Sequence, residues 1–440
     1  MNTKNPKVTK PIYIRVLLAS LAGSAIEWFD YFLYGTVAAL VFNKLFFPSF
    51  DPLVGLMLSY LSFSLTFFVR PFGGILFSHI GDRIGRKKTL VLTLSLMGSA
   101  TVLIGCLPTY ESIGVWAPIL LVLLRVIQGL GISGEWGGAL LLAYEYAPAN
   151  KKGFFACVPQ VGVPLGMLLA TLAMTLMSIL SDKDFLSWGW RVPFLLSAVL
   201  VFVGLWIRHG IGETPEFEKT KSRGDVAKAP FFETIKFHWR AVLIALGAKV
   251  VETAPFYIFT TFVVSYATGN LTYSRVTVLN AITVATSVTV IAIPLMGMLA
   301  DKIGSKRVFL TGAALMALFA YPYFILLDTG KTWGIILASV VAIGLIWAPI
   351  VATIGTVVAQ IFDTRVRYTG ITIGSQLGAA FAGGTAPLIA TWLLKENAGN
   401  WAAVAIYIMV CSCVSLVSVS RTLQHDAGEG REVILTTETT

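Results

Sequence analysis

Six charged side chains stand inside long apolar stretches of this sequence, where ionised groups are rare. They are Glu27, Asp30, Arg125, Glu135, Lys249 and Glu252. A charge at the centre of a bilayer costs about 2.5–3.5 kcal/mol on insertion scales, so such residues pair with one another or carry a function. The chemistry open to them is reversible protonation of a carboxylate and binding of a charged solute. Arg70 is a weaker candidate, because it lies close enough to the end of its apolar stretch to snorkel to the interface.

Asp30 and Arg125 are expected to lie at similar depth in their helices, because each residue of a helix rises about 1.5 Å. We expect Asp30 to carry a proton and Arg125 to modulate it, since a nearby guanidinium favours the charged carboxylate and is released when that carboxylate is protonated. A permanent structural ion pair is the alternative. Glu27, one turn before Asp30, is the second candidate for the proton site, and Glu135 is a further candidate.

Lys249 and Glu252 are three residues apart, so they can meet on one face of a helix. Either they neutralise each other, or Lys249 binds a carboxylate of the solute as a point charge and Glu252 shields it in the empty site. Tyr31 and Tyr34 lie on or near the face of Asp30 and could bind solute, although aromatic residues here more often serve packing. Further candidates for polar contact with the solute are Gln128, Gln160 and Gln376.

The segment Gly129–Gly134 reads GLGISG, which matches a dinucleotide-binding fingerprint. No strand precedes it and it lies within an apolar stretch, so we interpret its glycines as helix-packing residues and expect Glu135 to join a cavity. The histidines fall at or beyond the ends of the apolar stretches, and no HExxH, nucleophile elbow or metal spacing of cysteines occurs. The sequence therefore predicts a protein that is not an enzyme and has no metal or cofactor.

The elements that position these side chains follow from the composition. Of the 440 residues, 56% are hydrophobic and only 13% are charged, whereas about a quarter of the residues in soluble proteins are charged. A membrane span needs about 20 mostly apolar residues. Such stretches predict an all-α membrane protein of twelve transmembrane helices, at residues 17–42, 53–77, 89–108, 114–143, 154–180, 190–207, 240–267, 275–299, 307–327, 333–361, 369–394 and 400–421.

Basic residues concentrate in alternate connecting segments, which predicts that both termini face the cytoplasm. The same asymmetry explains the net charge of +10 without a nucleic-acid partner. We expect a monomer in the lipid bilayer of a bacterial inner membrane. The predicted parts are a cytoplasmic amino-terminal segment (1–16), a first six-helix bundle (17–207), a cytoplasmic central loop (208–239), a second six-helix bundle (240–421) and a cytoplasmic tail (422–440).

The two halves carry a related loop. Residues 82–88 read DRIGRKK after the second span, and residues 301–307 read DKIGSKR after the eighth. Two related six-helix bundles are typical of a transporter whose halves rock around a central site. The halves are therefore predicted to be pseudo-symmetric.

This loop and several further motifs resemble the metabolite:proton symporter branch of the major facilitator superfamily. The further motifs are Glu27–Gly35 (EWFDYFLYG), Arg70–Gly74 (RPFGG), Arg125–Gly129 (RVIQG), Gly134–Gly138 (GEWGG), Trp188–Phe194 (WGWRVPF) and Glu213–Glu218 (ETPEFE). The sequence departs from the pattern at four positions, Ser78, Ser133, Gln360 and Asp363.

The resemblance implies the major facilitator fold and secondary active transport by alternating access. Members import shikimate, α-ketoglutarate, citrate and other carboxylates, or zwitterions such as proline and betaine. We therefore expect import of a small organic acid anion with protons; symport of a zwitterionic osmolyte is the alternative, and drug or metabolite antiport is a third. The resemblance also implies that the loop residues latch the cytoplasmic side: Asp82, Arg83, Gly85, Arg86, Lys87, Asp301, Lys302 and Gly304.

Overall fold

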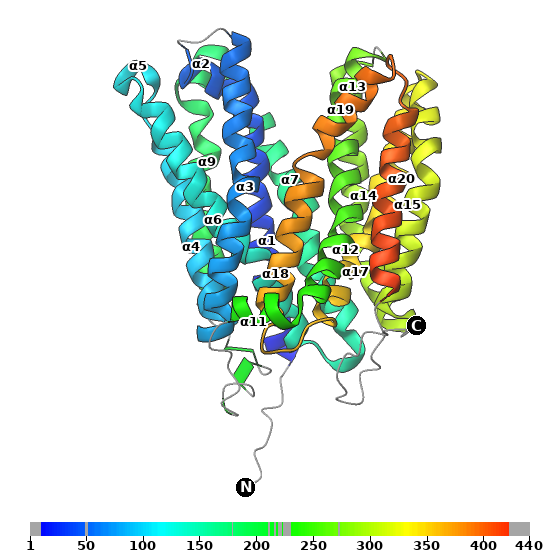
Figure 1. Ribbon diagram of the computed structural model, residues 1–440. Coiled ribbons are helices and arrows are strands. Elements are labelled where there is room, and N and C mark those ends of the chain that lie inside the picture. Colours follow the sequence, from blue (N-terminus) through cyan, green and yellow to red (C-terminus); the bar gives the residue numbers. More distant parts are fainter. Residues whose placement is uncertain are drawn as a thin grey trace.

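The computed structural model describes residues 10–48, 52–177, 179–209, 212–214, 217–218, 222, 230–271 and 273–421. Long helices run alongside one another through the whole molecule (Figure 1). Eleven stretches of the described residues are helices long and apolar enough to cross a membrane. Helix α3 (Pro52–Ile84), with 33 residues, is a further long helix between the first two of them. The predicted all-α membrane fold is therefore confirmed.

The first half of the chain forms one bundle, on the left of Figure 1, and the second half forms the other. The long helices of the first half, besides α3, are α1 (Lys10–Val37), α4 (Arg86–Cys106), α6 (Trp116–Tyr146), α7 (Lys152–Met177) and α9 (Arg191–His209). Short segments join them: η1 (Ala38–Phe42), α2 (Asn43–Leu45), α5 (Tyr110–Ile113), η2 (Ala149–Lys151), α8 (Asp182–Asp184) and η3 (Phe185–Gly189).

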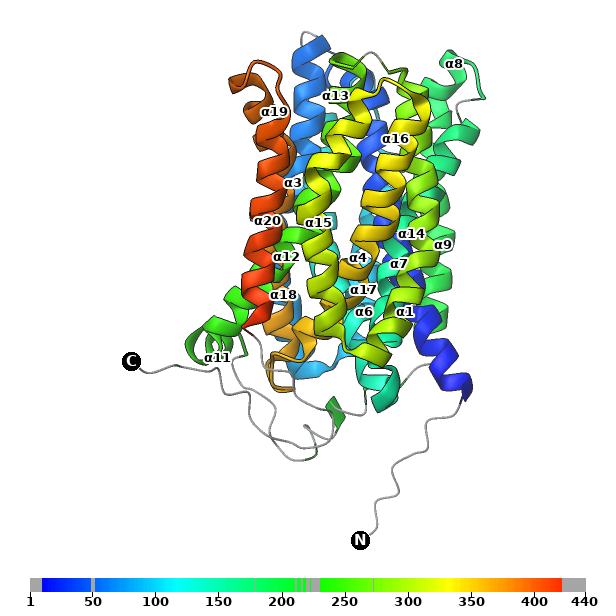
Figure 2. The same ribbon diagram turned by 90° about the vertical axis from the view of Figure 1, so that its right-hand side faces the viewer.

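Several spans of the second half are built from two helices joined by a π-helical stretch. They are α12 (Trp239–Tyr257), η4 (Ile258–Phe262) and α13 (Val263–Gly269); α16 (Thr332–Ser339), η5 (Val340–Ile346) and α17 (Trp347–Ala359); α18 (Arg367–Gly378), η6 (Ala379–Gly383) and α19 (Ala386–Glu396). The other helices are α11 (Pro230–Phe237), α14 (Arg275–Ile303), α15 (Ser305–Asp328) and α20 (Ala402–Ser420). Figure 2 shows α15, α16 and α20 on the outer face of this half.

Some predicted segments lie partly or wholly outside the described residues. The tail 422–440 is entirely outside them, and most of residues 1–16 and part of the central loop 208–239 are also outside. Helix α1 already begins at Lys10, seven residues before the predicted first span.

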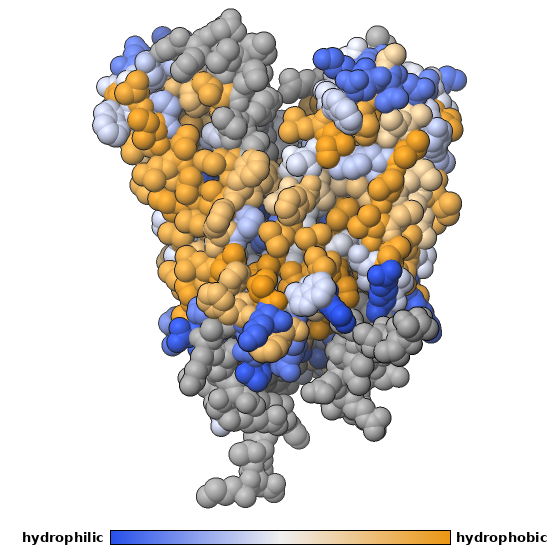
Figure 3. All heavy atoms as spheres, in the orientation of Figure 1, coloured by the Kyte–Doolittle hydropathy of each residue, from blue (hydrophilic) through white to orange (hydrophobic). Residues whose placement is uncertain are grey.

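A broad apolar zone covers the middle of the molecular surface, and hydrophilic side chains lie toward the two ends of the molecule (Figure 3). Exposed side chains of this zone include Phe202 and Trp206 on α9 and Leu318 on α15. In contrast, the span from Trp239 to Gly269 is mostly buried within the protein. Helices that are apolar all round and still expose large side chains require a lipid environment.

Helices α1 and α7 approach closely through two glycines one turn apart, Gly162 and Gly166. A Cβ atom added at Gly166 would lie 2.6 Å from the backbone nitrogen of Phe29 and 2.7 Å from the carbonyl oxygen of Ala25. Small residues spaced in this way allow helix backbones to touch within a membrane protein. This contact holds α1, which carries the buried acids, against the rest of the first half.

The Gly166→Ala variant is therefore expected to be less stable than the wild type by about 1–3 kcal/mol, because the added methyl group meets backbone atoms that cannot move aside. The measurement is the apparent melting temperature of the purified protein in detergent. Gly269→Ala is the matched control, since an added Cβ there has open space around it. Equal melting temperatures for the two variants would contradict the close contact.

Candidate solute-binding cavity and buried proton site

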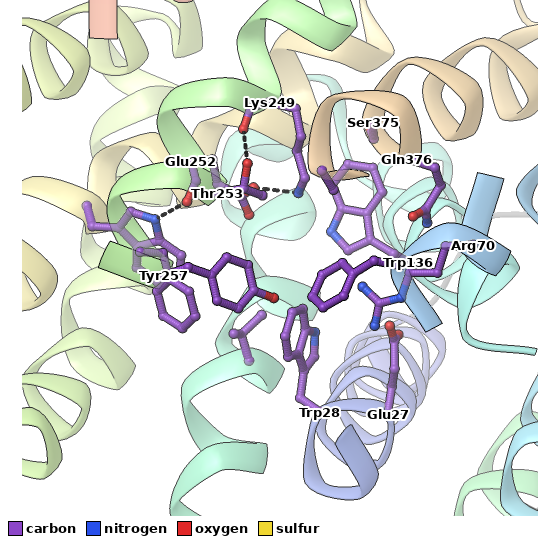
Figure 4. A pocket seen from close by; sticks show the side chains of 15 residues that line it. Glu27, Trp28, Arg70, Trp136, Lys249, Glu252, Thr253, Tyr257, Ser375 and Gln376 are labelled. Atoms are coloured by element: carbon purple, nitrogen blue, oxygen red, sulfur yellow. Dashed lines mark hydrogen bonds and ion pairs between the residues drawn. The ribbon is translucent and has the colours of Figure 1, made fainter. Parts of the chain in front are cut away.

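A cavity lies between the two halves. It is lined by residues of α1, α3, α6 and α7 in the first half and of α12, α17, α18 and η6 in the second (Figure 4). The lining residues are Glu27, Trp28, Phe67, Arg70, Trp136, Val163, Lys249, Glu252, Thr253, Phe256, Tyr257, Trp347, Ser375, Gln376 and Ala379. A site shared between two related bundles is where an alternating-access transporter binds its solute.

Lys249 and Glu252 lie side by side on α12. The ammonium nitrogen of Lys249 is 2.6 Å from Oε2 of Glu252, and it lies 4.4 Å from the centre of the Trp136 ring. Trp347 donates a hydrogen bond to the backbone carbonyl of Glu252 over 2.7 Å. This side of the cavity is therefore an ion pair whose charges offset each other, set against an aromatic wall from the first half.

Arg70 occupies the opposite part of the cavity, and the expectation that it snorkels to the interface is wrong. Its side chain is buried, and its guanidinium carbon lies 5.0 Å from the ring centre of Tyr31 and 5.3 Å from that of Phe67. The physical reason is the length of α3, which continues to Ile84, beyond the predicted end at residue 77. Arg70 is thus about four helical turns from the end of its helix.

The Arg70 guanidinium has unused donor capacity. Its Nε and Nη2 atoms have no hydrogen-bond partner among the described residues. Figure 4 shows Glu27 of α1 pointing toward this group, and Oε2 of Glu27 also has no hydrogen-bond partner in the described part of the chain. Buried polar groups are normally satisfied, so these atoms mark the place where a polar ligand is expected.

Asp30 lies outside this cavity, inside the first half. Its two carboxylate oxygens accept hydrogen bonds from Thr101 of α4 over 2.8 Å and from Ser197 of α9 over 2.7 Å. Thr101 in turn accepts a hydrogen bond from the amide of Gln128 over 2.8 Å, and the Gln128 carbonyl oxygen accepts one from Arg125. This series of hydrogen bonds takes the place of the predicted direct contact between Asp30 and Arg125. Equal depth along two helices does not determine how far apart the helices lie, and here the side chains of Thr101 and Gln128 fill the space between them.

The other predicted solute contacts on this side belong to the interior of the first half. Tyr34 shares a hydrogen bond with Ser62 over 2.7 Å, and the Arg125 guanidinium lies 3.9 Å from its ring centre. The residues that line the cavity do not include Tyr31, Tyr34 or Gln128. Gln160 lies behind the Trp136 ring that lines the cavity, and its carbonyl oxygen accepts a hydrogen bond from the Trp136 indole over 3.0 Å.

Glu135 does not join the cavity, contrary to expectation. It forms an ion pair with Arg208 of α9 and accepts a hydrogen bond from Thr93 over 3.2 Å. Arg208 also donates to the carbonyl oxygen of Leu90 over 2.7 Å. Sequence reasoning missed Arg208 because it placed the end of the sixth span at residue 207. A buried acid with its own arginine and a hydroxyl donor has the features of a structural pair.

Sequence reasoning also missed the aromatic walls of the cavity. These walls comprise Trp28, Phe67, Trp136, Phe256, Tyr257 and Trp347. Aromatic residues inside apolar spans carry no signal that separates a cavity wall from a lipid-facing or packed position. In the structure, Tyr257 and Trp347 stand directly beside the π-helical stretches η4 and η5, and such stretches often occur at functional sites.

The two halves are held together at one end of the bundle, which we call the closed end. There Asp82, near the end of α3, accepts hydrogen bonds from the backbone N–H and the hydroxyl of Thr369 over 2.9 and 2.7 Å. Thr369 lies in the first turn of α18, where unpaired N–H groups and the helix dipole favour a carboxylate. Arg86 forms ion pairs with Asp82 (3.0 Å) and Glu145 (3.7 Å).

The second copy of the loop makes the reciprocal contact. Asp301, near the end of α14, accepts hydrogen bonds from the backbone N–H groups of Gly153 and Phe154 over 2.6 and 3.0 Å. These residues lie in the first turn of α7, which belongs to the other half. Each loop aspartate thus binds the amino-terminal turn of a helix in the opposite bundle.

The remaining loop residues shape or flank this contact. Gly85 and Gly304 adopt positive φ values of 113° and 95°, which only glycine takes up readily, and they turn the chain sharply between helices. Lys87 donates to the carbonyl oxygen of His209 over 3.1 Å, whereas Arg83 and Lys302 are exposed.

Gln376, at the inner edge of the closed end, is the one predicted amide that reaches the cavity. It lines the cavity and donates to the carbonyl oxygen of Ser133 in α6 over 3.1 Å. The cavity floor is therefore also a contact between the halves. At the opposite end, Figure 1 shows the helices of the two halves diverging into two separate lobes.

Replacing both loop aspartates is expected to loosen the closed end. Asp82→Asn with Asp301→Asn should cost about 1 kcal/mol or more of closure, because charge at two helix amino-termini is lost. That corresponds to roughly fivefold faster labelling of a cysteine placed at Thr372, which lies in the contact between α3 and α18, in a background without the four native cysteines. Asp363→Asn, an exposed position at the same end, is the control. An unchanged labelling rate in the double variant would contradict this role.

Comparison with known proteins supports the same architecture. Residues 16–236 match the family model "Sugar (and other) transporter", and residues 248–433 match "Major Facilitator Superfamily". The shikimate transporter of Escherichia coli is 40% identical over 92% of this chain and 93% of its own. The proline/betaine transporter of the same organism is 33% identical over 92% of this chain and 82% of its own.

Solved structures share the fold at low sequence identity. The proton:xylose symporter XylE, bound to 6-bromo-6-deoxy-D-glucose, superposes with a TM-score of 0.74 at 15% identity and covers 93% of this chain and 95% of its own. These relatives are transporters rather than enzymes. The two bundles, the central cavity, the paired loop contacts and the matches along both halves make this multi-pass membrane protein a transporter of the major facilitator superfamily.

Proposed function

We propose that this transporter imports a small organic acid anion together with protons, by alternating access. The observation that carries the proposal is the Arg70 guanidinium, which is buried in the cavity with two N–H-bearing nitrogens that lack hydrogen-bond partners among the described residues. A guanidinium fork matches the two oxygens of a carboxylate. The aromatic walls then pack against the carbon skeleton of the acid.

The charges of the cavity support an anionic solute. Lys249 and Glu252 offset each other, which leaves Arg70 and Glu27 as the second basic and acidic groups of the lining. When Glu27 takes up a proton, the cavity gains a net positive charge. A single carboxylate then restores neutrality, so the solute anion and a proton favour each other's binding.

Asp30 is the group that we propose as the main proton carrier, with Glu27 second. Both hydroxyl groups that donate to Asp30 have an alternative acceptor, since Thr101 lies 3.0 Å from the carbonyl oxygen of Met97 and Ser197 lies 3.5 Å from that of Pro193. The protonated carboxyl can therefore donate to one of these hydroxyls, which turns to its carbonyl. Both protonation states of Asp30 keep their hydrogen bonds, as a reversible proton site requires.

The same proposal assigns a direction to the molecule. The basic loops favour a cytoplasmic position for the closed end in a bacterial cell; in this orientation the separated lobes face outward and receive solute from outside. Uptake of solute and proton then favours release of the loop aspartates from the opposite helices and opening toward the cytoplasm. The protein acts as a monomer in this scheme, because each chain contains a complete cavity.

Symport of a zwitterionic osmolyte is the second candidate. The observation in its favour is the number of aromatic rings around the cavity, because tryptophan and tyrosine faces bind quaternary ammonium groups. The proline/betaine transporter, 33% identical, fits this alternative, and the shikimate transporter, 40% identical, fits the first.

Thermal stabilisation with shikimate, α-ketoglutarate, glycine betaine and proline should separate the two candidates. A ligand that binds only the folded state raises the melting temperature by mass action. We expect stabilisation by an organic acid, with affinity reduced roughly 30-fold or more in Arg70→Ala because a buried charge partner is removed. Arg307→Ala, an exposed position, is the control. Stabilisation by betaine or proline alone would overturn the organic-acid assignment.

Transport by Asp30→Asn tests the proton carrier. In proteoliposomes this variant should exchange solute across the membrane but lose accumulation against a gradient under an imposed pH difference, because the amide cannot bind the coupled proton. Glu27→Gln is measured in parallel. If Asp30→Asn still accumulates solute while Glu27→Gln does not, the proton carrier is Glu27 instead.

A further inference from the structure

The proton site and the solute cavity are separate places in this protein, and Tyr31 lies between them. Asp30 is enclosed by α1, α4 and α9 through its hydrogen bonds to Thr101 and Ser197. The cavity is shared by both halves. We propose that the ring of Tyr31 is the positioning element that couples protonation of Asp30 to binding of an organic anion at Arg70. This inference rests on the proposed function.

One aromatic ring contacts both guanidinium groups. The ring centre of Tyr31 lies 5.7 Å from the guanidinium carbon of Arg125 and 5.0 Å from that of Arg70. A cation near an aromatic face is attracted by the ring quadrupole, within about 6 Å. Tyr31 is fully buried, so water does not screen these contacts. Both guanidinium groups therefore contact the same ring. When one guanidinium moves, it displaces the Tyr31 ring relative to the other.

Arg125 responds to the charge of Asp30 through the hydrogen-bond chain of Gln128 and Thr101. With Asp30 ionised, Thr101 donates to the carboxylate and the chain holds Arg125 toward it. When Asp30 is protonated its negative charge disappears and the Thr101 hydroxyl turns to Met97. The pull on Arg125 weakens, so its guanidinium moves further over the tyrosine rings, and Tyr31 is displaced relative to Arg70.

Few other charged groups compete for Asp30. On α1 itself, Glu27 lies one turn away and lines the cavity. Of the helices packed against α1, α6 brings Arg125 and, almost three and more than five turns further along, Glu135 and Glu145. Helix α9 brings Arg208, which is paired with Glu135, and otherwise has Arg191 and His209 at its ends. Helix α3 brings Arg70. Its other charged and histidine residues, His79, Asp82 and Arg83, lie toward the closed end. Helices α4 and α7 carry charged side chains only in their first turns, at the closed end. Arg125 is therefore the charged group whose position depends on the charge of Asp30.

The displacement of Tyr31 can reach the second half through ring contacts. Tyr31 packs edge-on against Phe67 with centroids 5.8 Å apart, and Phe67 packs edge-on against Tyr257 of α12, also at 5.8 Å. Tyr257 stands directly before η4. The ring of Tyr31 thus links the interior of one half to a cavity residue of the other.

The experiment compares Tyr31→Leu, Tyr31→Phe and Phe32→Leu in proteoliposomes with radiolabelled shikimate as the probe. Two rates are measured for each: accumulation driven by an imposed pH difference, and exchange between equal shikimate concentrations without one. Tyr31→Phe keeps the ring, whereas Tyr31→Leu removes it. Phe32→Leu is the matched control, because Phe32 packs on Trp28 and Tyr31 in the same helix but belongs to neither site.

We expect Tyr31→Leu to lose at least tenfold of its driven accumulation while it retains exchange within about threefold of the wild type. Tyr31→Phe and Phe32→Leu should keep both rates. The dissociation constant for shikimate should be lower at pH 6 than at pH 8 in the wild type and in Tyr31→Phe, and this difference should become smaller in Tyr31→Leu, which keeps only the contribution of Glu27.

Two outcomes would overturn the coupling role. One is retention of driven accumulation by Tyr31→Leu; the other is equal loss of exchange and accumulation, which would indicate a structural defect. Failure of the proposed function has a different signature, because the wild type itself would then neither bind shikimate nor accumulate it under a pH difference.

Discussion

Burial separates the ionised side chains inside this bundle from bulk water, and that constraint organises the arrangement of its buried charges. Most charged groups among the buried side chains discussed above are met by a countercharge, a hydroxyl donor, a helix terminus or an aromatic face. Glu135 with Arg208 and Lys249 with Glu252 are direct pairs. Asp30 is held by hydroxyl groups and Arg70 by rings. The direct pair of Glu135 is fixed by several partners, whereas the hydroxyl groups that hold Asp30 have alternative acceptors, as the proposed transport cycle requires.

The closed end uses the same constraint to join the two bundles through polar contacts. The carboxylates of Asp82 and Asp301 each satisfy N–H groups that a helix terminus leaves unpaired. Because the two contacts are reciprocal, each half supplies one acceptor and one helix terminus. Opening this end exchanges both contacts for water at once, which favours a two-state change over gradual deformation.

The sequence predicts features that depend on one helix and fails where neighbouring helices decide. Lys249 and Glu252 were expected on one face from their spacing, and they lie together on α12. The contact of Arg208 with Glu135 depends on which faces of α6 and α9 meet, and periodicity does not give that. The burial of Arg70 depends on where α3 ends, and a hydropathy window ended this helix too early. Asp30 and Arg125 were expected to meet from their positions along two helices, but Thr101 and Gln128 occupy the space between them.

The separation of the Asp30 site from the cavity has an evolutionary consequence. Replacing a cavity residue such as Ser375 or Thr253 alters the surface that meets the cargo and leaves Thr101, Ser197 and Gln128 untouched. Under the proton-carrying role proposed for Asp30, a gene duplicate could therefore acquire a new cargo through a few substitutions while it inherits its energy source intact. Relatives named for cargoes as different as shikimate and betaine are the kind of diversity that such a division of labour permits.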